Sequence, residues 1–280
     1  MRPAPSASPL LPVLTAALVA VLACRPAAAP TPPAPTGPAT PTAPPATPPA
    51  SAPADVQAIL DDPARPASER ALDPGRHPAE LLAFLDLKPG MKTADIGAGM
   101  GYTTFLLARA VGPTGRVYAQ NPRFVRDRFT EPGFTERMAT PAFANVVRVD
   151  QEFDQPLPAD VRDLDLIINF LFYHDAYWMK VDVAAMNRAI FTALRPGGAY
   201  VIVDHSALAG AGSTGSQTLH RVEESQVRRE VEAAGFRLET TADFRRSPAD
   251  TRDWNASPRA AEAAGRRGQA DRFILKFVKP

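Results

Sequence analysis

The stretch Asp95-Ile96-Gly97-Ala98-Gly99-Met100-Gly101 joins a strand-like segment to a segment with a helical pattern. Residues 93–96 have the pattern of a buried strand, and residues 101–111 have that of a helix. Glycines at alternate positions permit a tight turn and allow a ligand to approach bare backbone. Because open sheets of this type bind ligands at the carboxyl ends of their strands, the stretch predicts a binding site.

The spacing of the glycines narrows the class of ligand. It reads G-x-G-x-G, and Tyr102 occupies the position where the dinucleotide fingerprint G-x-G-x-x-G has its third glycine. Asp95 stands two positions before the first glycine, and its negative charge would repel a pyrophosphate. The stretch therefore favours a zwitterionic or cationic ligand, such as the methionine end of S-adenosylmethionine.

Strands and helices are predicted to alternate along the rest of the chain. Further strands are expected at 116–119, 145–149, 164–169, 200–204, 236–240 and 273–278, and further helices at 79–87, 181–194 and 221–234. Such alternation predicts a parallel sheet with helices on both faces. No helical pattern separates the last two strands, so they are expected to pair antiparallel at the sheet edge.

The composition limits the classes of function. The chain has 280 residues, is 45% hydrophobic and carries a formal net charge of +1. This is enough apolar material for a folded core, and the near-neutral charge gives no reason to expect nucleic acid as a partner. The single cysteine, Cys24, rules out both an internal disulfide and a cysteine metal site.

The first 54 residues are expected to lie outside the folded domain. Residues 1–24 contain a short apolar run ending at Cys24 and resemble a bacterial lipoprotein signal, in which the cysteine after the cleavage site becomes lipid-modified. An ordinary secretory signal is the alternative. Residues 25–54 are almost entirely Pro, Ala and Thr and predict an extended linker. The folded domain is expected to span residues 55–280, with a helical or irregular lead-in over residues 55–73.

From residue 77 onward the chain resembles the class I S-adenosylmethionine-dependent methyltransferases, and most closely a group of predicted, exported bacterial members. The resemblance is carried by the glycine stretch at 95–101, the strand at 164–169, Leu194-Arg195-Pro196-Gly197-Gly198, and Asp271-Arg272-Phe273. It implies an α/β, Rossmann-like sheet of seven strands, mostly parallel, with helices on both faces and an antiparallel last strand. It also implies that S-adenosylmethionine is the cofactor. The implied cofactor-binding residues are Asp95, Gly97, Gly99, Gly101 and Asn169.

The second strand departs from the family pattern. The family usually ends this strand with an acidic residue that accepts hydrogen bonds from the ribose, whereas this chain has Gln120 and Asn121. Either amide oxygen is a candidate acceptor, although it is weaker than a carboxylate. Nearby Arg123 would suit the 2'-phosphate of NADP or be a solvated helix residue. Asp150, after the third strand, is a candidate for the adenine edge or a loop carboxylate that caps a turn.

The acceptor side is predicted after the fourth and fifth strands. His174 and Asp175 follow the fourth strand within an aromatic run, and His205 follows the fifth. His174 is our preferred general base, Asp175 its orienting partner, and His205 the reserve candidate. These histidines could instead satisfy buried backbone groups. Two further segments bear on this side: His220, Arg221 and Glu223 are predicted first as a solvated helix face and second as acceptor contacts, and residues 242–270 as a polar insertion of the kind that forms lids.

Three hypotheses follow from the sequence. The first is a methyltransferase acting on a small-molecule acceptor, exported to the periplasmic side and attached to a membrane only through a lipid on Cys24. The second is an NADP-dependent oxidoreductase. The third is a non-catalytic binding protein that keeps the fold, because an exported enzyme would need a supply of S-adenosylmethionine outside the cytoplasm. No spacing of His, Asp or Glu resembles a metal site, so no metal is predicted.

Overall fold

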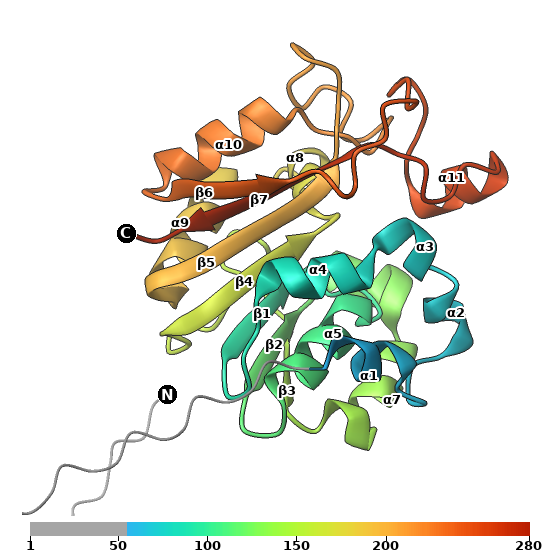
Figure 1. Ribbon diagram of the computed structural model, residues 1–280. Coiled ribbons are helices and arrows are strands. Elements are labelled where there is room, and N and C mark those ends of the chain that lie inside the picture. The colour runs from blue at the N-terminus through green and yellow to red at the C-terminus, as the bar shows by residue number, and fades with distance from the viewer. Residues whose placement is uncertain (1–54) are drawn as a thin grey trace, which may run out of the picture. The chain divides into compact units, whose positions relative to one another are not determined.

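The computed structural model describes residues 55–280 as seven strands and the helices around them (Figure 1). The strands are β1 (Lys92–Ile96), β2 (Arg116–Gln120), β3 (Val146–Val149), β4 (Leu164–Phe170), β5 (Leu194–His205), β6 (Arg237–Ala242) and β7 (Arg272–Val278). The longer helices are α4 (Pro78–Leu85), α5 (Tyr102–Val111), α9 (Val183–Ala193) and α10 (Glu224–Ala233). The shorter ones are α1 (Val56–Asp61), α2 (Ala67–Arg70), α3 (Asp73–Arg76), α6 (Arg123–Val125), α7 (Gly133–Met138), α8 (Tyr173–Trp178) and α11 (Pro258–Ala263), with single turns at Arg126–Thr130 and Pro141–Phe143.

The seven strands form one sheet in the order β3-β2-β1-β4-β5-β7-β6. The pairs from β3 to β5 are parallel, and β7 runs antiparallel to both of its neighbours. Ile96 at the end of β1 pairs with Gln120 of β2 and Asn169 of β4, so the carboxyl ends of these strands meet beside the glycine stretch. The predicted Rossmann-like α/β sheet with an antiparallel last strand is confirmed.

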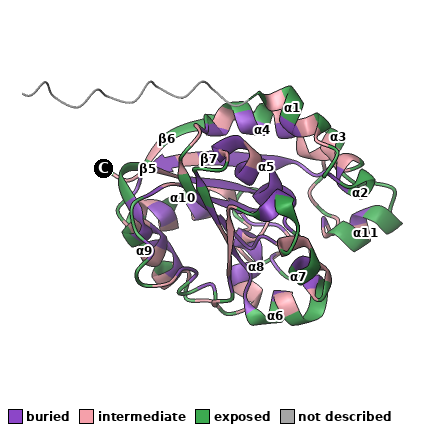
Figure 2. Cartoon of the chain, turned by 90° about the horizontal axis from the view of Figure 1, so that it is seen from below, coloured by how far each residue is buried: buried purple, intermediate pink, exposed green. Residues whose placement is uncertain are grey.

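Helices cover both faces of the sheet and divide the core into two main clusters (Figures 1 and 2). In β4, Ile167 packs with α8, α9 and α10, whereas its neighbours Leu166 and Ile168 pack with α1, α4 and α5. This alternation follows from the period of two in a strand. It explains why the central strands are continuous apolar runs, since both of their faces are buried.

The structure differs from the sequence prediction mainly at element ends and in short helices. β5 begins at Leu194, six residues earlier than predicted, because Leu194 already pairs with Leu164 before an irregularity in the register. The lead-in over residues 55–73 contains α1 and α2 and ends at the start of α3. Of the two predictions for this segment, helical or irregular, the structure favours the helical one. The predicted helix at 221–234 begins three residues later, at Glu224.

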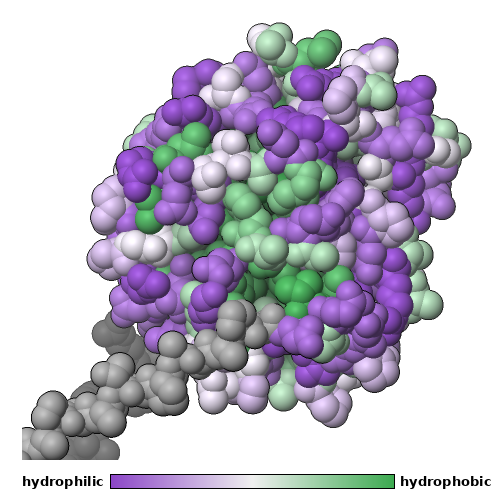
Figure 3. Space-filling view, viewed as in Figure 1, coloured by the Kyte–Doolittle hydropathy of each residue, from purple (hydrophilic) through white to green (hydrophobic). Residues whose placement is uncertain are grey.

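The surface viewed in Figure 3 carries a band of apolar residues across its middle, bordered by polar residues. Within residues 55–280, no helix combines the length and the apolar character that crossing a bilayer requires. The predicted signal at 1–24 and linker at 25–54 lie outside the described residues.

Candidate functional site

The three glycines of the stretch have different structural roles. All adopt positive φ, at +71° for Gly97, +57° for Gly99 and +84° for Gly101. A Cβ on Gly97 would lie 2.5 Å from the ring of Phe172, and one on Gly101 would lie 3.4 Å from the rings of Phe134 and Phe143. A Cβ on Gly99 would meet nothing within 4 Å. The backbone is therefore open to a ligand at Gly99, whereas Gly97 and Gly101 are needed for packing.

The side chains of Gln120 and Asn121 hold the glycine stretch in place. The Gly97 N–H donates to Gln120 Oε1 at 3.0 Å, and the Gly99 N–H donates to Asn121 Oδ1 at 2.8 Å. Asn121 Nδ2 donates back to the Gly99 carbonyl at 3.0 Å, and Gln120 Nε2 donates to the Gln151 carbonyl. Both amide oxygens thus accept protein N–H groups, and both residues are buried. The two residues therefore clamp the glycine stretch, and the predicted ribose contact stays a prediction.

Asp95 and Asn169 place unsatisfied polar atoms at the carboxyl ends of β1 and β4. Both side chains are buried. Asp95 Oδ2 accepts from Thr104 Oγ1 at 2.6 Å, while its Oδ1 has no hydrogen-bond partner. The Asn169 amide has no partner at either atom. Burial raises the pKa of Asp95 to about 6, partly offset by hydrogen bonds from Thr104 and by the charge of Arg76. Buried polar atoms without partners are costly, so these atoms are suited to a polar ligand.

Two other residues that were predicted as ligand contacts, Asp150 and Arg123, form ion pairs at the surface. Asp150 accepts from Arg148 Nε at 2.9 Å and lies 3.3 Å from Arg126. The side chain of Arg123 is 79% exposed and contacts Asp127 on the same helical segment. Of the two alternatives for Arg123, the structure favours the solvated helix residue. Asp150 forms ion pairs with Arg148 and Arg126.

Aromatic side chains lie beside the glycine stretch. Phe172 precedes α8 and packs directly over Gly97. Trp178 at the end of α8 contacts Phe124 edge-on, with ring centroids 5.7 Å apart, and Phe124 contacts Phe129 in the same way. Phe124 and Phe129 are exposed. The aromatic run predicted on the acceptor side therefore contacts the glycine stretch through Phe172 at Gly97.

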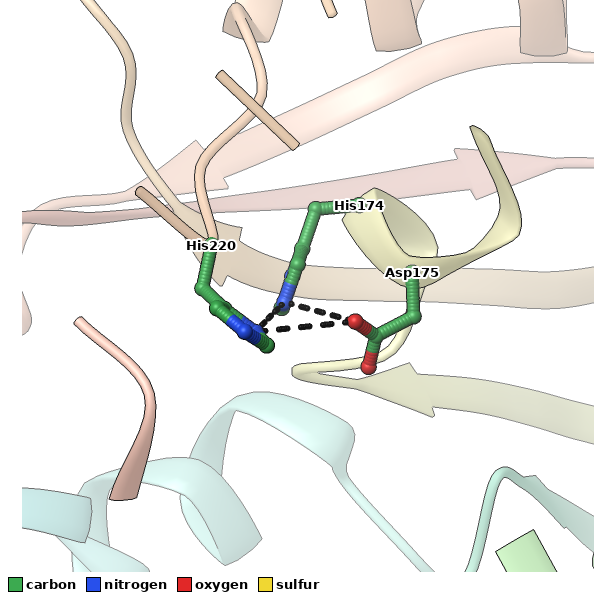
Figure 4. Close-up of side chains that lie close together, drawn as sticks. All are labelled: His174, Asp175 and His220. Carbon is green, nitrogen blue, oxygen red and sulfur yellow. Dashed lines mark hydrogen bonds and ion pairs between the residues drawn. The ribbon is translucent and has the colours of Figure 1, made fainter. Parts of the chain in front are cut away.

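The first turn of α8 brings His174 and Asp175 together with His220 (Figure 4). His174 Nε2 lies 3.1 Å from His220 Nδ1 and 3.3 Å from Asp175 Oδ1, and the last two atoms are 3.6 Å apart. His174 and Asp175 are buried, whereas the side chain of His220 is 25% exposed. His220 also has a φ of +52°, a left-handed conformation that few non-glycine residues adopt.

Asp204, which the sequence did not single out, fixes His174 from the other side. Its Oδ1 lies 2.7 Å from His174 Nδ1 and accepts from the His205 N–H, and its Oδ2 accepts from the His174 N–H at 2.7 Å. Asp204 is at the end of β5 and completely buried. Its adjacency to His205 in the sequence was the available signal, but its contact with His174 depends on the pairing of β4 with β5.

Burial and neighbouring charges shift the pKa values of the two histidines in this cluster. Burial lowers the pKa of His174, but the carboxylates of Asp204 and Asp175 outweigh it and hold this pKa at about 10. Burial and the charge of His174 lower the pKa of His220. Both ring nitrogens of His174 thus lie beside other polar side chains, and its role as general base stays a prediction.

His205 and Arg221 have structural contacts. Burial and Arg272 lower the pKa of His205 well below its usual value, and its Nδ1 lies 3.1 Å from the carbonyl of His220. The Arg221 and Asp250 side chains are both 0% exposed and form an ion pair at 2.8 Å. The prediction that Arg221 lies on a solvated face is wrong, because it ties the 242–270 insertion to the segment before α10.

A cavity of about 350 Å³ lies beyond the end of β5. Ser206, next to His205, forms part of its wall. Its other lining residues are mostly polar and come from the segments around α10 and the insertion: Ala207, Ala209, Glu223, Glu224, Ser225, Arg228, Arg246 and Arg252. Its volume is in the range of small-molecule sites.

The fold is shared with solved S-adenosylmethionine-dependent methyltransferases. A structure described as a SAM dependent methyltransferase from Aquifex aeolicus superposes with a TM-score of 0.53 at 19% identity, covering 81% of this chain and 99% of the other. The chain therefore has the class I methyltransferase fold, and the fold predicted from the resemblance is confirmed.

The sequence comparison is confined to the region around the glycine stretch. Residues 72–121 match the family model of protein-L-isoaspartate(D-aspartate) O-methyltransferase. The chain is 58% identical over 38 residues to the protein-L-isoaspartate O-methyltransferase of Aeropyrum pernix, and 50% identical over 34 residues to that of Methanothermobacter thermautotrophicus. These matches span only 15% and 16% of the two relatives. The matched region contains α4, β1, α5 and β2, but neither His174 nor His220.

Proposed function

We propose that this protein is an S-adenosylmethionine-dependent methyltransferase acting on a small-molecule acceptor. The proposal depends on one observation: at the carboxyl ends of β1 and β4, Asp95 and Asn169 offer buried polar atoms without partners beside the open backbone of Gly99. When bound, S-adenosylmethionine supplies a methyl group on a positively charged sulfur. Asp95 would hold its ammonium group, and Asn169 would bond its polar edges.

The charges around Asp95 suit a zwitterion. Burial lowers the pKa of Arg76, whose guanidinium lies 4.2 Å from the ring centroid of Tyr102 and interacts with the charge of Asp95. A carboxylate and a guanidinium at one site are complementary to an amino acid head group. The aromatic rings of Phe172 and Trp178 would stabilise the sulfonium charge from the side.

The alternative of an NADP-dependent oxidoreductase has less support. A pyrophosphate needs free backbone N–H groups at the helix amino terminus. Here the N–H groups of Gly97 and Gly99 donate to the amides of Gln120 and Asn121, and that of Gly101 donates to the Ala98 carbonyl. Arg123, the candidate partner for a 2'-phosphate, is exposed. The three glycines therefore present no free N–H group to a pyrophosphate.

The acceptor is proposed to bind between the His174 cluster and the cavity beyond β5. The cavity matches a small molecule in volume, and its charged lining favours a polar one. The two named relatives are protein-L-isoaspartate methyltransferases, but the matched region does not include the residues after β4. A protein acceptor thus has no support from the acceptor side of this chain.

The Asp95→Asn substitution is expected to weaken binding of S-adenosylhomocysteine while stabilising the protein. The variant loses a charged contact worth about 1.5–3 kcal/mol, which corresponds to a roughly 10- to 100-fold loss of affinity. It also removes a buried charge, so at pH 8 the free energy of unfolding should rise by up to roughly 3 kcal/mol. Calorimetric titration and urea unfolding measure the two effects.

The pH dependence of the free energy of unfolding shows whether the stabilisation in Asp95→Asn comes from removal of the buried charge. The pKa of Asp95 is higher in the folded state. The contribution of Asp95 to the free energy of unfolding of the parent is therefore fully present below pH 4 and is lost as pH rises through about 6. The difference between Asp95→Asn and the parent should therefore be small at pH 4 and large at pH 8. A variant that is less stable at pH 8, or that binds S-adenosylhomocysteine as tightly as the parent, would contradict the proposed contact.

The location remains a proposal based on residues 1–24. We propose that the chain is exported and held on the periplasmic side by a lipid on Cys24. The Cys24→Ser variant should accumulate as unprocessed precursor, whereas the parent should fractionate with membranes and have the mass of a lipidated chain beginning at Cys24. A soluble mature protein with an unmodified terminus at another residue would refute this location.

A further inference from the structure

Three potential ligand atoms converge at the start of α8. His174 Nε2, His220 Nδ1 and Asp175 Oδ1 form a triangle with sides of 3.1, 3.3 and 3.6 Å (Figure 4). These distances make the three residues one of two groups among residues 55–280 that could hold a metal ion. Two imidazole nitrogens and a carboxylate oxygen are a common set of ligands for zinc and other divalent transition metals.

The size of this triangle fits a single ion. Zinc bonds to imidazole nitrogen and carboxylate oxygen are about 2.0–2.2 Å long. Three such ligands at angles between octahedral and tetrahedral values are about 2.8–3.6 Å from one another. The three measured separations fall in this range, so an ion would need little rearrangement of the side chains. Without an ion, a proton on His174 Nε2 would lie between His220 Nδ1 and Asp175 Oδ1, and a bound ion would displace it.

The surrounding contacts are of the kind that orient metal ligands. A histidine that binds metal through one ring nitrogen usually bonds a carboxylate or carbonyl through the other. His174 does so through Nδ1, which is 2.7 Å from Asp204 Oδ1. The indole N–H of Trp178 donates to Asp175 Oδ1 at 2.6 Å, which fixes the rotation of that carboxylate. Both ligands on α8 are therefore held before any ion binds.

The second candidate group is His174, Asp204 and His205. Asp204 already accepts the N–H groups of His174 and His205, and His205 Nδ1 contacts the His220 carbonyl. All three residues are buried, which leaves little access for an ion or substrate. The first group is preferred because one of its members, His220, is partly exposed.

We propose that His174, Asp175 and His220 bind one divalent transition metal ion, with Zn²⁺ as the representative ion. Three protein ligands leave at least one coordination position open, as in catalytic zinc sites. The sequence could not reveal this group, because His220 is 46 residues from His174 and reaches it only through the loop after β5.

A metal here would prepare the methyl acceptor, and this role rests on the proposed function. The ion would lower the pKa of an acceptor hydroxyl, which loses its proton to water. The oxygen would then form a bond to the methyl carbon while the carbon–sulfur bond breaks and its electron pair passes to sulfur. The positive charge on sulfur is thereby neutralised, and no oxidant or reductant is required.

The test is metal binding by the full chain without a polyhistidine tag. After removal of metals with a chelator, the protein is titrated with Zn²⁺ by calorimetry and with Co²⁺ by visible absorption. We expect one ion per chain at micromolar or lower concentration, and for Co²⁺ the visible bands of a four- or five-coordinate ion. Neither readout involves S-adenosylmethionine, so failure of the metal site is distinguishable from failure of the proposed function.

His220→Asn and His77→Asn form a matched pair for this experiment. Both histidines have left-handed backbone, with φ of +52° and +47°, and asparagine tolerates that conformation. His77 contacts Glu80 and is outside the cluster. His220→Asn should weaken Zn²⁺ binding by more than about 100-fold, whereas His77→Asn should bind like the parent. Asp175→Asn, a near-isosteric second variant, should also lose affinity.

Several outcomes would overturn the metal site. One is a parent protein, folded by circular dichroism, that takes up neither Zn²⁺ nor Co²⁺ at about 10-fold molar excess over the chain. Another is a folded His220→Asn variant that binds as tightly as the parent. Equal losses in His220→Asn and His77→Asn would place the binding elsewhere, and would also contradict the assignment.

Discussion

The Gly99→Asn variant should lose binding of S-adenosylhomocysteine by at least about 100-fold while remaining folded. A Cβ at Gly99 would meet no protein atom within 4 Å, so the added side chain occupies ligand space rather than the core. Asparagine is chosen because it is the residue after glycine that best tolerates φ near +57°. Calorimetric titration gives the affinity, and thermal unfolding confirms the folded state.

Gly265→Asn is the matched control for this variant. Gly265 has φ of +64°, and a Cβ added there would also meet no atom within 4 Å, but this glycine follows α11, outside the glycine stretch. Both variants thus carry the same backbone cost, and only Gly99→Asn should affect ligand affinity. Equal affinities in the two variants would mean that the ligand does not lie on Gly99.

The His174→Ala variant should lower turnover by roughly 10²- to 10⁴-fold. This is the range observed when a group that transfers a proton or stabilises charge in the transition state is removed. A positive charge at this position stabilises an anionic acceptor oxygen, whether it is the imidazolium of His174 or the proposed metal ion. The affinity for S-adenosylmethionine should change little, because in the proposed site Asp95 and Asn169 would hold that ligand. Turnover requires an acceptor, to be found by screening phenols, amines and quinone-like compounds with methyl-labelled cofactor.

His77→Ala is the control for turnover, since it removes a half-exposed histidine outside the cluster. Full turnover in His174→Ala would make the cluster structural and leave positioning as the only contribution to catalysis. Loss of cofactor binding in the same variant would show that the cofactor and acceptor sides are assigned wrongly. Absence of turnover in the parent with every acceptor, together with tight cofactor binding, would favour the non-catalytic binding protein.

Most of the fold could be predicted from the sequence because its signals are local. The strand-like segment at 93–96, the glycines and the helical pattern behind them predict β1 and α5, and the continuous apolar runs identify buried parallel strands such as β4. The short helices α6, α7 and α8 have too few residues for a clear period, and only tertiary packing stabilises them. The early start of β5 at Leu194 could not be predicted either, because it depends on pairing with Leu164 of β4.

The candidate site was predictable only in part. Asp95 and Gly99 lie where the glycine stretch indicates, but the amides of Gln120 and Asn121 turn toward the backbone of that stretch rather than toward a ligand. Such a choice depends on rotamers that no sequence pattern specifies. The contacts of His174 with Asp204 and His220 join three segments of the chain, so neither its raised pKa nor the proposed metal site has a signature in residue spacing.

Calorimetric titration of the purified protein with S-adenosylhomocysteine, S-adenosylmethionine and NADPH in parallel decides which cofactor the glycine stretch binds. We expect one site per chain for the first two ligands, with micromolar affinity, and no binding of NADPH. Binding of NADPH without binding of either sulfur ligand would contradict the methyltransferase proposal and would restore the oxidoreductase hypothesis.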